Sequence, residues 1–279
     1  MTESHRARLA RASLPPTPPS GRGSLRPAIP GMDPELGLLS KTSLDTAQGL
    51  LASLRRIELP ELLRQINEIG LRSLTFISVT LGFVGAILVY QAGIQALRLV
   101  PDTSAVGASY LELLVRDLAA SVTALMLSAR VGAGIAAEIG SMKVTDQLDA
   151  LRLCRTDPMD YLIAPKVAAS FIVTPLLTLF GGLVATFTGA VTGYFAFGIN
   201  PSVFLDPRHI DGGDLIVGSL KALAFGLVIP IVSGHAGLNA AGGSEGVGNA
   251  TTRAVVGASS AVIVLGFFIG VLGQLTFGP

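Results

Sequence analysis

The sequence predicts an all-α membrane protein with about five transmembrane helices. Half of its 279 residues are hydrophobic and only 14% are charged, and uncharged runs of about 20 apolar residues recur along the chain. A soluble domain of this size could not shield so much apolar surface from water. Trp is absent and there are 33 glycines, which favours closely packed helices over a β-barrel with its aromatic girdles.

The sequence gives no indication of catalytic, metal or cofactor chemistry. A single cysteine, Cys154, and three scattered histidines provide neither a disulfide nor a set of metal ligands. The glycine-rich stretch 242–248 resembles a phosphate-binding loop, but no Gly-Lys-Ser/Thr follows it, and we interpret it as a flexible cytoplasmic turn. Ser and His residues are present, but no spaced set of partner residues accompanies them, so no catalytic triad can be argued. We therefore expect a protein that is not an enzyme and binds no cofactor or metal.

Three regions follow one another along the chain. Residues 1–33 are rich in Pro, Ser and Arg and lack the apolar core of a signal peptide, which predicts a disordered cytoplasmic tail. Residues 34–70 are expected to hold an amphipathic helix lying on the membrane surface, because apolar residues recur at helical spacing over 44–54 and arginines follow them. An ordinary connecting helix is the alternative. Residues 71–279 form the membrane domain.

Four of the five expected spans are plain in the sequence, and the fifth depends on topology. The plain ones are residues 74–97, 167–205, 215–238 and 254–279, of which 167–205 is longer than one span needs, and the weaker one, 111–137, contains four charged residues. With five spans and the amino end inside, sixteen of the 20 Lys and Arg residues lie on the cytoplasmic side, as the positive-inside rule requires. Reversing the orientation or omitting the second span spoils this bias. We therefore expect a cytoplasmic amino end and a carboxyl end outside.

The segment between the second and third spans is helix-like and amphipathic. Val144, Leu148 and Leu151 fall at i, i+4 and i+7, while the charged residues between them point elsewhere, and Asp157-Pro158 ends the run. On the cytoplasmic side such a helix either lies at the lipid interface or docks into a groove of a soluble partner. The spacing gives both interpretations equal weight.

Several charged residues fall inside the expected spans. Lys221 at mid-bilayer would cost about 2.5–3.5 kcal/mol, so it must either extend to the membrane surface or face a polar cavity with a partner. Asp117 on a neighbouring span is the natural candidate. Glu112 and Arg116 stand at i, i+4, a spacing that suits a simple ion pair near the outer surface.

Small residues at four-residue spacing indicate where helices could approach closely. Gly189 with Gly193 and Gly266 with Gly270 have this spacing in the third and fifth spans. In a chain this rich in glycine the signal is weak, and most such pairs pack neighbours within one bundle.

The stretch ARVGAGIAAEIGSMKVTDQLDAL at residues 129–151, followed by Asp157-Pro158 and Ala164-Pro-Lys166, closely resembles the signature of MlaE-type (YrbE-type) permeases. These are the membrane subunits of maintenance-of-lipid-asymmetry and mammalian-cell-entry ABC transporters. The likeness extends to Gly85 and Gln91 in the first span, to Lys221, and to ATTRAVV at residues 250–256. It covers roughly residue 61 to the carboxyl end.

The resemblance implies a fold, an assembly and a location. Family members form a homodimer in the cell inner membrane, with a fold like the ABCG exporters, an amino-terminal interfacial helix and a lipid-sized cavity enclosed by the spans. The partners implied are a cytosolic ABC ATPase, a periplasmic MCE-domain protein, a small STAS-domain protein and phospholipid, and no nucleic acid. The carboxyl end is then periplasmic. The loop between spans two and three acts as a coupling helix on the ATPase, which here implies Glu138, Met142, Val144, Asp146, Gln147, Leu148 and Leu151.

The expected mechanism is conformational rather than catalytic. ATP hydrolysis by the partner pushes the coupling helices of two copies, and the dimer moves a phospholipid or a related lipid between the inner membrane and the periplasm. An apolar cavity lined by first-span side chains such as Leu81, Val84, Leu88 and Tyr90 would suit acyl chains. The same face of the first span could instead form the core of the dimer. The hypothesis is that Asp117 and Lys221 recognise or gate the phosphate head group. The expected cavity residues are Leu81, Val84, Leu88, Tyr90, Gln91, Asp117 and Lys221.

The sequence departs from the family pattern in two places. The family commonly reads Arg-Glu-Leu-Gly-Pro where residues 116–120 read RDLAA, and the acidic residue that some members carry in the last span is missing around residues 265–267. A polar network that needs this acid is therefore not expected.

Two alternative functions are also open. One is a secondary carrier or channel that uses Lys221 and Asp117 for ion coupling, and the other is a membrane scaffold that transports nothing.

Overall fold

The computed structural model describes residues 59–99, 104–154, 158–206 and 211–277, and within these ranges every regular element is a helix. The predicted tail, residues 1–33, and the amphipathic run at 44–54 lie outside the described residues. The α-helices of the described part are α3 (Leu59–Ile69), α4 (Leu71–Leu99), α5 (Ser104–Leu113), α6 (Ala119–Leu127), α7 (Ala133–Val144), α8 (Gln147–Leu153), α9 (Ala164–Phe197), α10 (Gly212–Leu238) and α11 (Gly243–Phe277).

Five helices are long and apolar enough to cross a membrane, which confirms the predicted fold class of a multi-pass protein. The weakly predicted second span is among them, and it is assembled from α5, α6 and α7 joined through two π-helical turns, Leu114–Leu118 and Ser128–Gly132. A π turn fits one extra residue into the helix and often marks a functional position. Each of these turns carries an arginine of the second span, Arg116 or Arg130.

Two boundaries differ from the prediction because of backbone geometry. The third span ends at Phe197 rather than near residue 205, since Gly198 has a positive φ of 67° and ends the helix, and a short 3₁₀ helix, Pro201–Leu205, follows. The glycine-rich stretch 242–248 is not a flexible turn throughout. Gly242 and Gly243 have positive φ, but α11 begins at Gly243, so the turn after α10 is only a few residues long.

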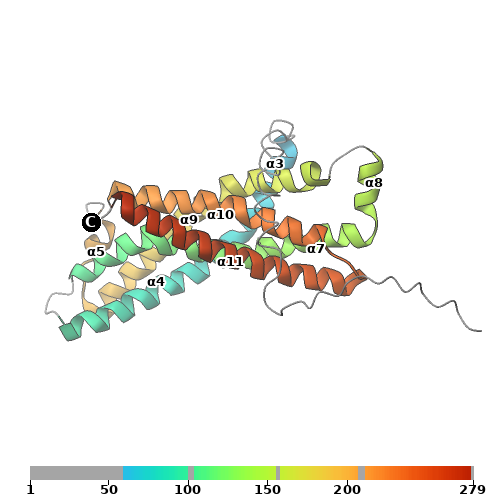
Figure 1. Ribbon diagram of the computed structural model, residues 1–279. Helices are drawn as coiled ribbons and strands as arrows, with labels where there is room; N and C mark the ends of the chain where they lie inside the picture. Colours follow the sequence, from blue (N-terminus) through green and yellow to red (C-terminus); the bar gives the residue numbers. More distant parts are fainter. Residues whose placement is uncertain (1–58, 100–103, 155–157, 207–210, 278–279) are drawn as a thin grey trace, which may run out of the picture. The chain divides into compact units, whose positions relative to one another are not determined.

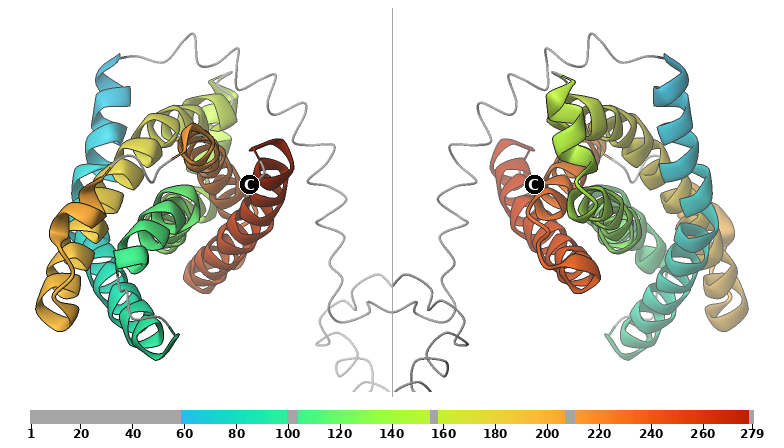
Figure 2. Two further views of the ribbon diagram at one scale, coloured as in Figure 1. Left: turned by 90° about the vertical axis from the view of Figure 1, so that its left-hand side faces the viewer. Right: turned by 90° about the vertical axis from the view of Figure 1, so that its right-hand side faces the viewer.

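The spans pack in two pairs that meet directly through α9 and α10, and the second span also contacts both pairs. α4 packs along α9, and α10 packs along α11. The second span contacts helices of both pairs, and Figure 2, which looks along the spans, shows it in green between them. This central position explains how a segment with four charged residues can be a membrane span: half of its most apolar stretch is buried by neighbouring helices.

Two helices run across the direction of the spans. In Figure 1 the spans run horizontally, whereas α3 and α8 stand upright, and α8 closes the end of the bundle between α7 and α9. α11 has 35 residues, which is about 50 Å of helix, while the hydrocarbon core of a bilayer is about 30 Å thick. The spans are therefore longer than the membrane, and we expect the end that carries α8 to project into water.

Close helix contacts depend on glycines that the four-residue spacing did not identify. A methyl group on Gly85 of α4 would lie 2.5 Å from the carbonyl oxygen of Ala185 in α9, and one on Gly218 of α10 would lie 2.3 Å from the carbonyl oxygen of Val115. The pairs expected from spacing also pack inside the chain. Gly189 lies against Tyr110, and Gly270 lies against Lys221.

We expect Gly85→Ala to destabilise the protein, because the added methyl group would press on the backbone of α9, which cannot move aside as a flexible side chain could. Overpacking of this kind costs about 1–3 kcal/mol. The measurement is the loss of helical circular dichroism on heating in detergent. Gly134→Ala is the matched control, since nothing lies within 4 Å of its added methyl group. Equal melting temperatures for the two variants would contradict the role given to Gly85.

Candidate functional site

The candidate site is built on the π turn Leu114–Leu118, where the second span meets α10. The turn presents Arg116 and Asp117 to two residues of α10 that are seven positions apart and so share a face of that helix. Arg116 Nη1 donates to Asp214 Oδ1 at 3.1 Å, and Lys221 Nζ donates to Asp117 Oδ1 at 2.6 Å. Two ion pairs therefore join the second and fourth spans.

Lys221 meets Asp117, which confirms the pairing expected from their positions inside apolar spans. The Lys221 side chain is 2% exposed, whereas that of Asp117 is 51% exposed. The lysine does not extend to the membrane surface. Its ammonium group is enclosed partly because Gly270 of α11, which has no side chain, passes over it, with the position of an added methyl group only 3.3 Å from Nζ. The exposed half of the pair is thus the carboxylate, not the ammonium group.

Arg116 and Asp214 form the second pair, which the sequence did not predict. The expected partner of Arg116 was Glu112 at i, i+4, and that expectation is wrong: the π turn changes the helical register, and Arg116 reaches Asp214 on α10 and Gln274 on α11. Asp214 also accepts a hydrogen bond from the backbone N–H of Asp211 and so caps the start of α10. The seven-residue spacing of Asp214 and Lys221 was the available signal.

Beside these pairs is a cavity of about 410 Å³ between the second span, α10 and α11. One part of its wall is polar, formed by Asp117, Ser121, Lys221 and Gln274, and Ser121 donates to Asp117 at 3.2 Å. The rest is apolar and belongs mostly to α11. Those residues are Leu125, Val262, Ile263, Gly266, Phe267, Gly270 and Val271. The cavity therefore combines a charged end with apolar walls, as an amphipathic ligand requires.

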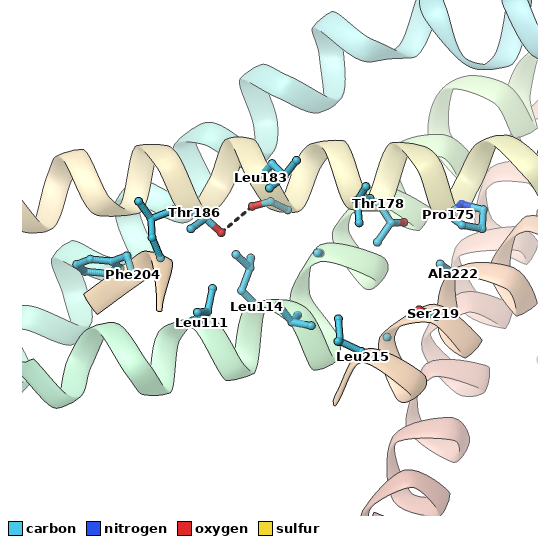
Figure 3. Close-up of a pocket in the computed structure, with 16 residues that line it drawn as sticks. Leu111, Leu114, Pro175, Thr178, Leu183, Thr186, Phe204, Leu215, Ser219 and Ala222 are labelled. Atoms are coloured by element: carbon cyan, nitrogen blue, oxygen red, sulfur yellow. Dashed lines mark hydrogen bonds between the residues drawn. The ribbon is translucent and has the colours of Figure 1, made fainter. Parts of the chain in front are cut away.

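A second cavity, of about 280 Å³, is almost wholly apolar and lies between the second span, α9 and α10. Figure 3 shows Leu111 and Leu114 on one side and Leu183 and Thr186 on the other. The Thr186 hydroxyl donates to the carbonyl oxygen of Gly182 at 2.9 Å, so it adds little polarity to the wall. This cavity offers no charged group to fix the position of a ligand.

The expected cavity residues of the first span do not join this site. Leu81 is fully buried in the helical core, where it fills the space left by Gly181, and Val84 and Leu88 are half-buried. Tyr90 and Gln91 are exposed, and the ring of Tyr90 lies 5.8 Å from that of Phe197. Within one chain, α4 therefore contributes no residue to the lining of the cavity that holds Asp117 and Lys221.

The expected single amphipathic helix over residues 138–152 is instead two helices. α7 ends at Val144 and α8 begins at Gln147, because Asp146 has a positive φ of 57°, a conformation that Asp tolerates better than most residues. The i, i+4, i+7 pattern therefore does not lie on one helical face. Leu148 is fully buried in the chain's own core, and Leu151 is half-buried.

The other residues of this segment differ in exposure. Asp146 and Gln147 are exposed and Met142 is half-buried. Glu138 accepts a hydrogen bond from Lys166 Nζ of α9 at 2.7 Å, so its carboxylate links α7 to α9 while remaining partly exposed. Leu153, at the end of α8, is 87% exposed and was not among the residues expected from the sequence. No pattern in the sequence distinguishes Leu153 from the other leucines of α8, because its exposure depends on how α8 packs against the bundle.

The fold and this site define the class of protein. A bundle of five membrane-length helices with a charged, amphipathic cavity between its spans is compatible with a membrane transport protein. Residues 62–272 match the sequence family described as Permease MlaE. The chain belongs to the MlaE permease family, and it is an ABC transporter permease subunit.

Individual relatives agree with this family membership. A probable ABC transporter permease of Synechocystis sp. is 38% identical over 216 residues, covering 77% of this chain and 82% of that protein. A probable ABC transporter permease of Rickettsia conorii is 36% identical over 210 residues, covering 75% and 81%. The protein TRIGALACTOSYLDIACYLGLYCEROL 1, chloroplastic, of Arabidopsis thaliana is 32% identical over 209 residues, covering 74% of this chain and 59% of that protein.

Proposed function

We propose that this chain moves a phospholipid or a related lipid between the inner membrane and the periplasm, driven by ATP hydrolysis in a separate partner subunit. The observation that carries the proposal is the cavity between the second span, α10 and α11, whose charged end holds Asp117 and Lys221 and whose remaining wall is apolar. A lipid has the matching division into a charged head group and apolar chains. The name of the Arabidopsis relative, which is that of a glycolipid, supports a lipid as cargo.

The pairing of Asp117 with Lys221 suggests how a head group is recognised. Lys221 already donates to Asp117 and is 2% exposed, so an incoming phosphate must compete with the carboxylate for the ammonium group. Lys has three N–H donors. The pair can therefore open as the phosphate arrives and close after it leaves, which makes it a gate as well as a binding site.

Two copies of the chain are proposed to form the working unit. In its most apolar stretch, α11 has 11% of its residues buried, against 33–50% in the other four spans. Ile263, Phe267 and Val271 of this exposed helix also line the cavity, so a second copy packed beside α11 would enclose the bound lipid. The exposed Tyr90 and Gln91 of α4 remain proposed contributors to the enclosed space.

The remaining parts of the assembly are proposed from family membership and from the sequence. The chain has no Gly-Lys-Ser/Thr motif, which supports placing ATP hydrolysis in a separate cytosolic subunit. α8 is the proposed contact with that subunit, and it lies across the end of the bundle (Figure 1). This end would be cytoplasmic, as would the amino end, with the carboxyl end in the periplasm. A periplasmic MCE-domain protein and a STAS-domain subunit complete the proposed complex.

The test is ATP-dependent lipid transfer in proteoliposomes that contain the chain together with the ATPase that co-purifies with it. We expect a fluorescent phospholipid to move between the membrane and an acceptor only when ATP is hydrolysed, because the chain has no energy source of its own. The control is an ATPase whose Walker lysine is replaced by alanine. Transfer driven by an ion gradient without nucleotide would contradict the proposal and favour a secondary carrier.

A further inference from the structure

A separate polar cavity of about 200 Å³ lies where α3 meets the second span and α9. Its lining combines three basic residues with two acidic ones and one amide. The polar residues are Gln65, Glu68, Arg72, Arg130, Glu138 and Lys166. None of them takes part in the cavity of Asp117 and Lys221.

The charges around this cavity do not balance. Lys166 Nζ lies 2.7 Å from Glu138, and Arg72 lies 3.5 Å from Glu68, so these two cations have carboxylate partners. Arg130 is half-buried, and its partner in the described structure is the hydroxyl of Ser73, with no carboxylate bonded to it. A guanidinium group has five N–H donors. Arg130 therefore brings an uncompensated positive charge and spare donors to the cavity.

We infer from the neighbouring helices that the cavity lies near a membrane surface. Ser73, which bonds Arg130, stands two residues after the start of α4, where the apolar stretch of the first span begins. α3, which provides Gln65 and Glu68, runs across the spans, as a helix lying in the plane of a membrane surface would (Figures 1 and 2). Phosphate groups of lipids occupy this level of a bilayer, between the hydrocarbon core and water.

We propose that this cavity binds a phosphate group, held by the Arg130 guanidinium through two parallel N–H···O bonds and assisted by Arg72. Arg matches phosphate in both geometry and charge. A phosphodiester carries a single negative charge, which offsets that of Arg130. The phosphate comes either from an anionic phospholipid of the leaflet next to α8 or from a soluble anion. The inference requires only that the chain spans a membrane, not that it transports lipid.

The test measures binding by the full-length chain in detergent, without ATPase or transport. The probes are short-chain phosphatidylglycerol and inorganic phosphate, with short-chain phosphatidylcholine for comparison. We expect Arg130→Gln to weaken binding of a phosphate probe by roughly ten-fold or more, as the loss of charge-assisted hydrogen bonds predicts, and Arg130→Lys to restore part of it. Arg253→Gln is the matched control, because Arg253 is exposed on α11 and lies outside the cavity lining.

The outcomes separate the two sources and can overturn the site. Tight binding of phosphatidylglycerol that phosphate does not displace assigns the site to a lipid head group, while displacement by phosphate assigns it to a soluble anion. If Arg130→Gln does not fold, Arg72→Gln replaces it, since the Arg72 side chain is 70% exposed. Binding of both probes that is unchanged in these variants, or equally weakened by Arg253→Gln, overturns the proposal. None of these results depends on whether the transport proposal holds.

Discussion

Asp117→Asn is expected to destabilise the protein more than Lys221→Met does. Removing Asp117 leaves a lysine that is 2% exposed with a buried, unpaired charge, whereas removing Lys221 leaves a carboxylate that is half exposed and still accepts a hydrogen bond from Ser121. Breaking a buried ion pair costs about 3–5 kcal/mol, and we expect about 3 kcal/mol for Asp117→Asn and about 1 kcal/mol for Lys221→Met. The order of the two effects is the prediction.

The measurement is thermal unfolding in detergent followed by circular dichroism, since the chain has no Trp to report by fluorescence. The double variant Asp117→Asn/Lys221→Met serves as the control, because it removes both charges and should be more stable than Asp117→Asn alone. In the transport assay both single variants should lose ATP-driven lipid transfer. A larger stability loss for Lys221→Met than for Asp117→Asn would show that the lysine is not the buried member of the pair.

The second large effect is expected in α8, where two leucines have opposite environments. Leu148→Ala should lower the melting temperature, because Leu148 is fully buried in the chain's core and truncation of such a leucine costs about 2–5 kcal/mol. Leu153→Ala should leave the melting temperature unchanged, since that side chain is 87% exposed. It should instead weaken binding of the partner ATPase by about ten-fold, the loss typical of an exposed apolar anchor.

Each variant is the control for the other, because the same side-chain atoms are removed from the same helix. The measurements are the melting temperature of the isolated chain and the affinity for the purified ATPase. The opposite pattern, in which Leu148→Ala weakens ATPase binding without loss of stability and Leu153→Ala changes nothing, would restore the prediction from the sequence that Leu148 is an outward anchor. It would also contradict the burial that the structure shows.

The candidate site could be predicted only in part from the sequence. Asp117 and Lys221 were paired correctly because a charge in an apolar span needs a partner, and few charged residues were available. Arg116 was assigned to Glu112 because i, i+4 spacing assumes a regular α-helix, and the π turn invalidates that assumption. The unbalanced Arg130 was missed because its environment is formed by α3, α4 and α9, which lie far from it in the sequence.

The break between α7 and α8 was not predicted for a similar reason, because the spacing argument assumes a regular helix. The apolar spacing of Val144, Leu148 and Leu151 indicates a single helix only if the backbone stays helical throughout, and Asp146 breaks it with a positive φ. Which face of α8 is buried then depends on the bundle it packs against. No local pattern contains that information.

By itself the sequence determined the fold class, the five spans and the family resemblance, because hydropathy, helix length and a contiguous motif are properties of neighbouring residues. Only the tertiary structure decided which member of the Asp117–Lys221 pair is buried, which leucine of α8 is available to a partner, and that Arg130 bonds a serine hydroxyl rather than a carboxylate of the described residues. The burial and the charge partners of these side chains depend on contacts between helices that are distant in sequence, so they are set by the packing of the whole bundle.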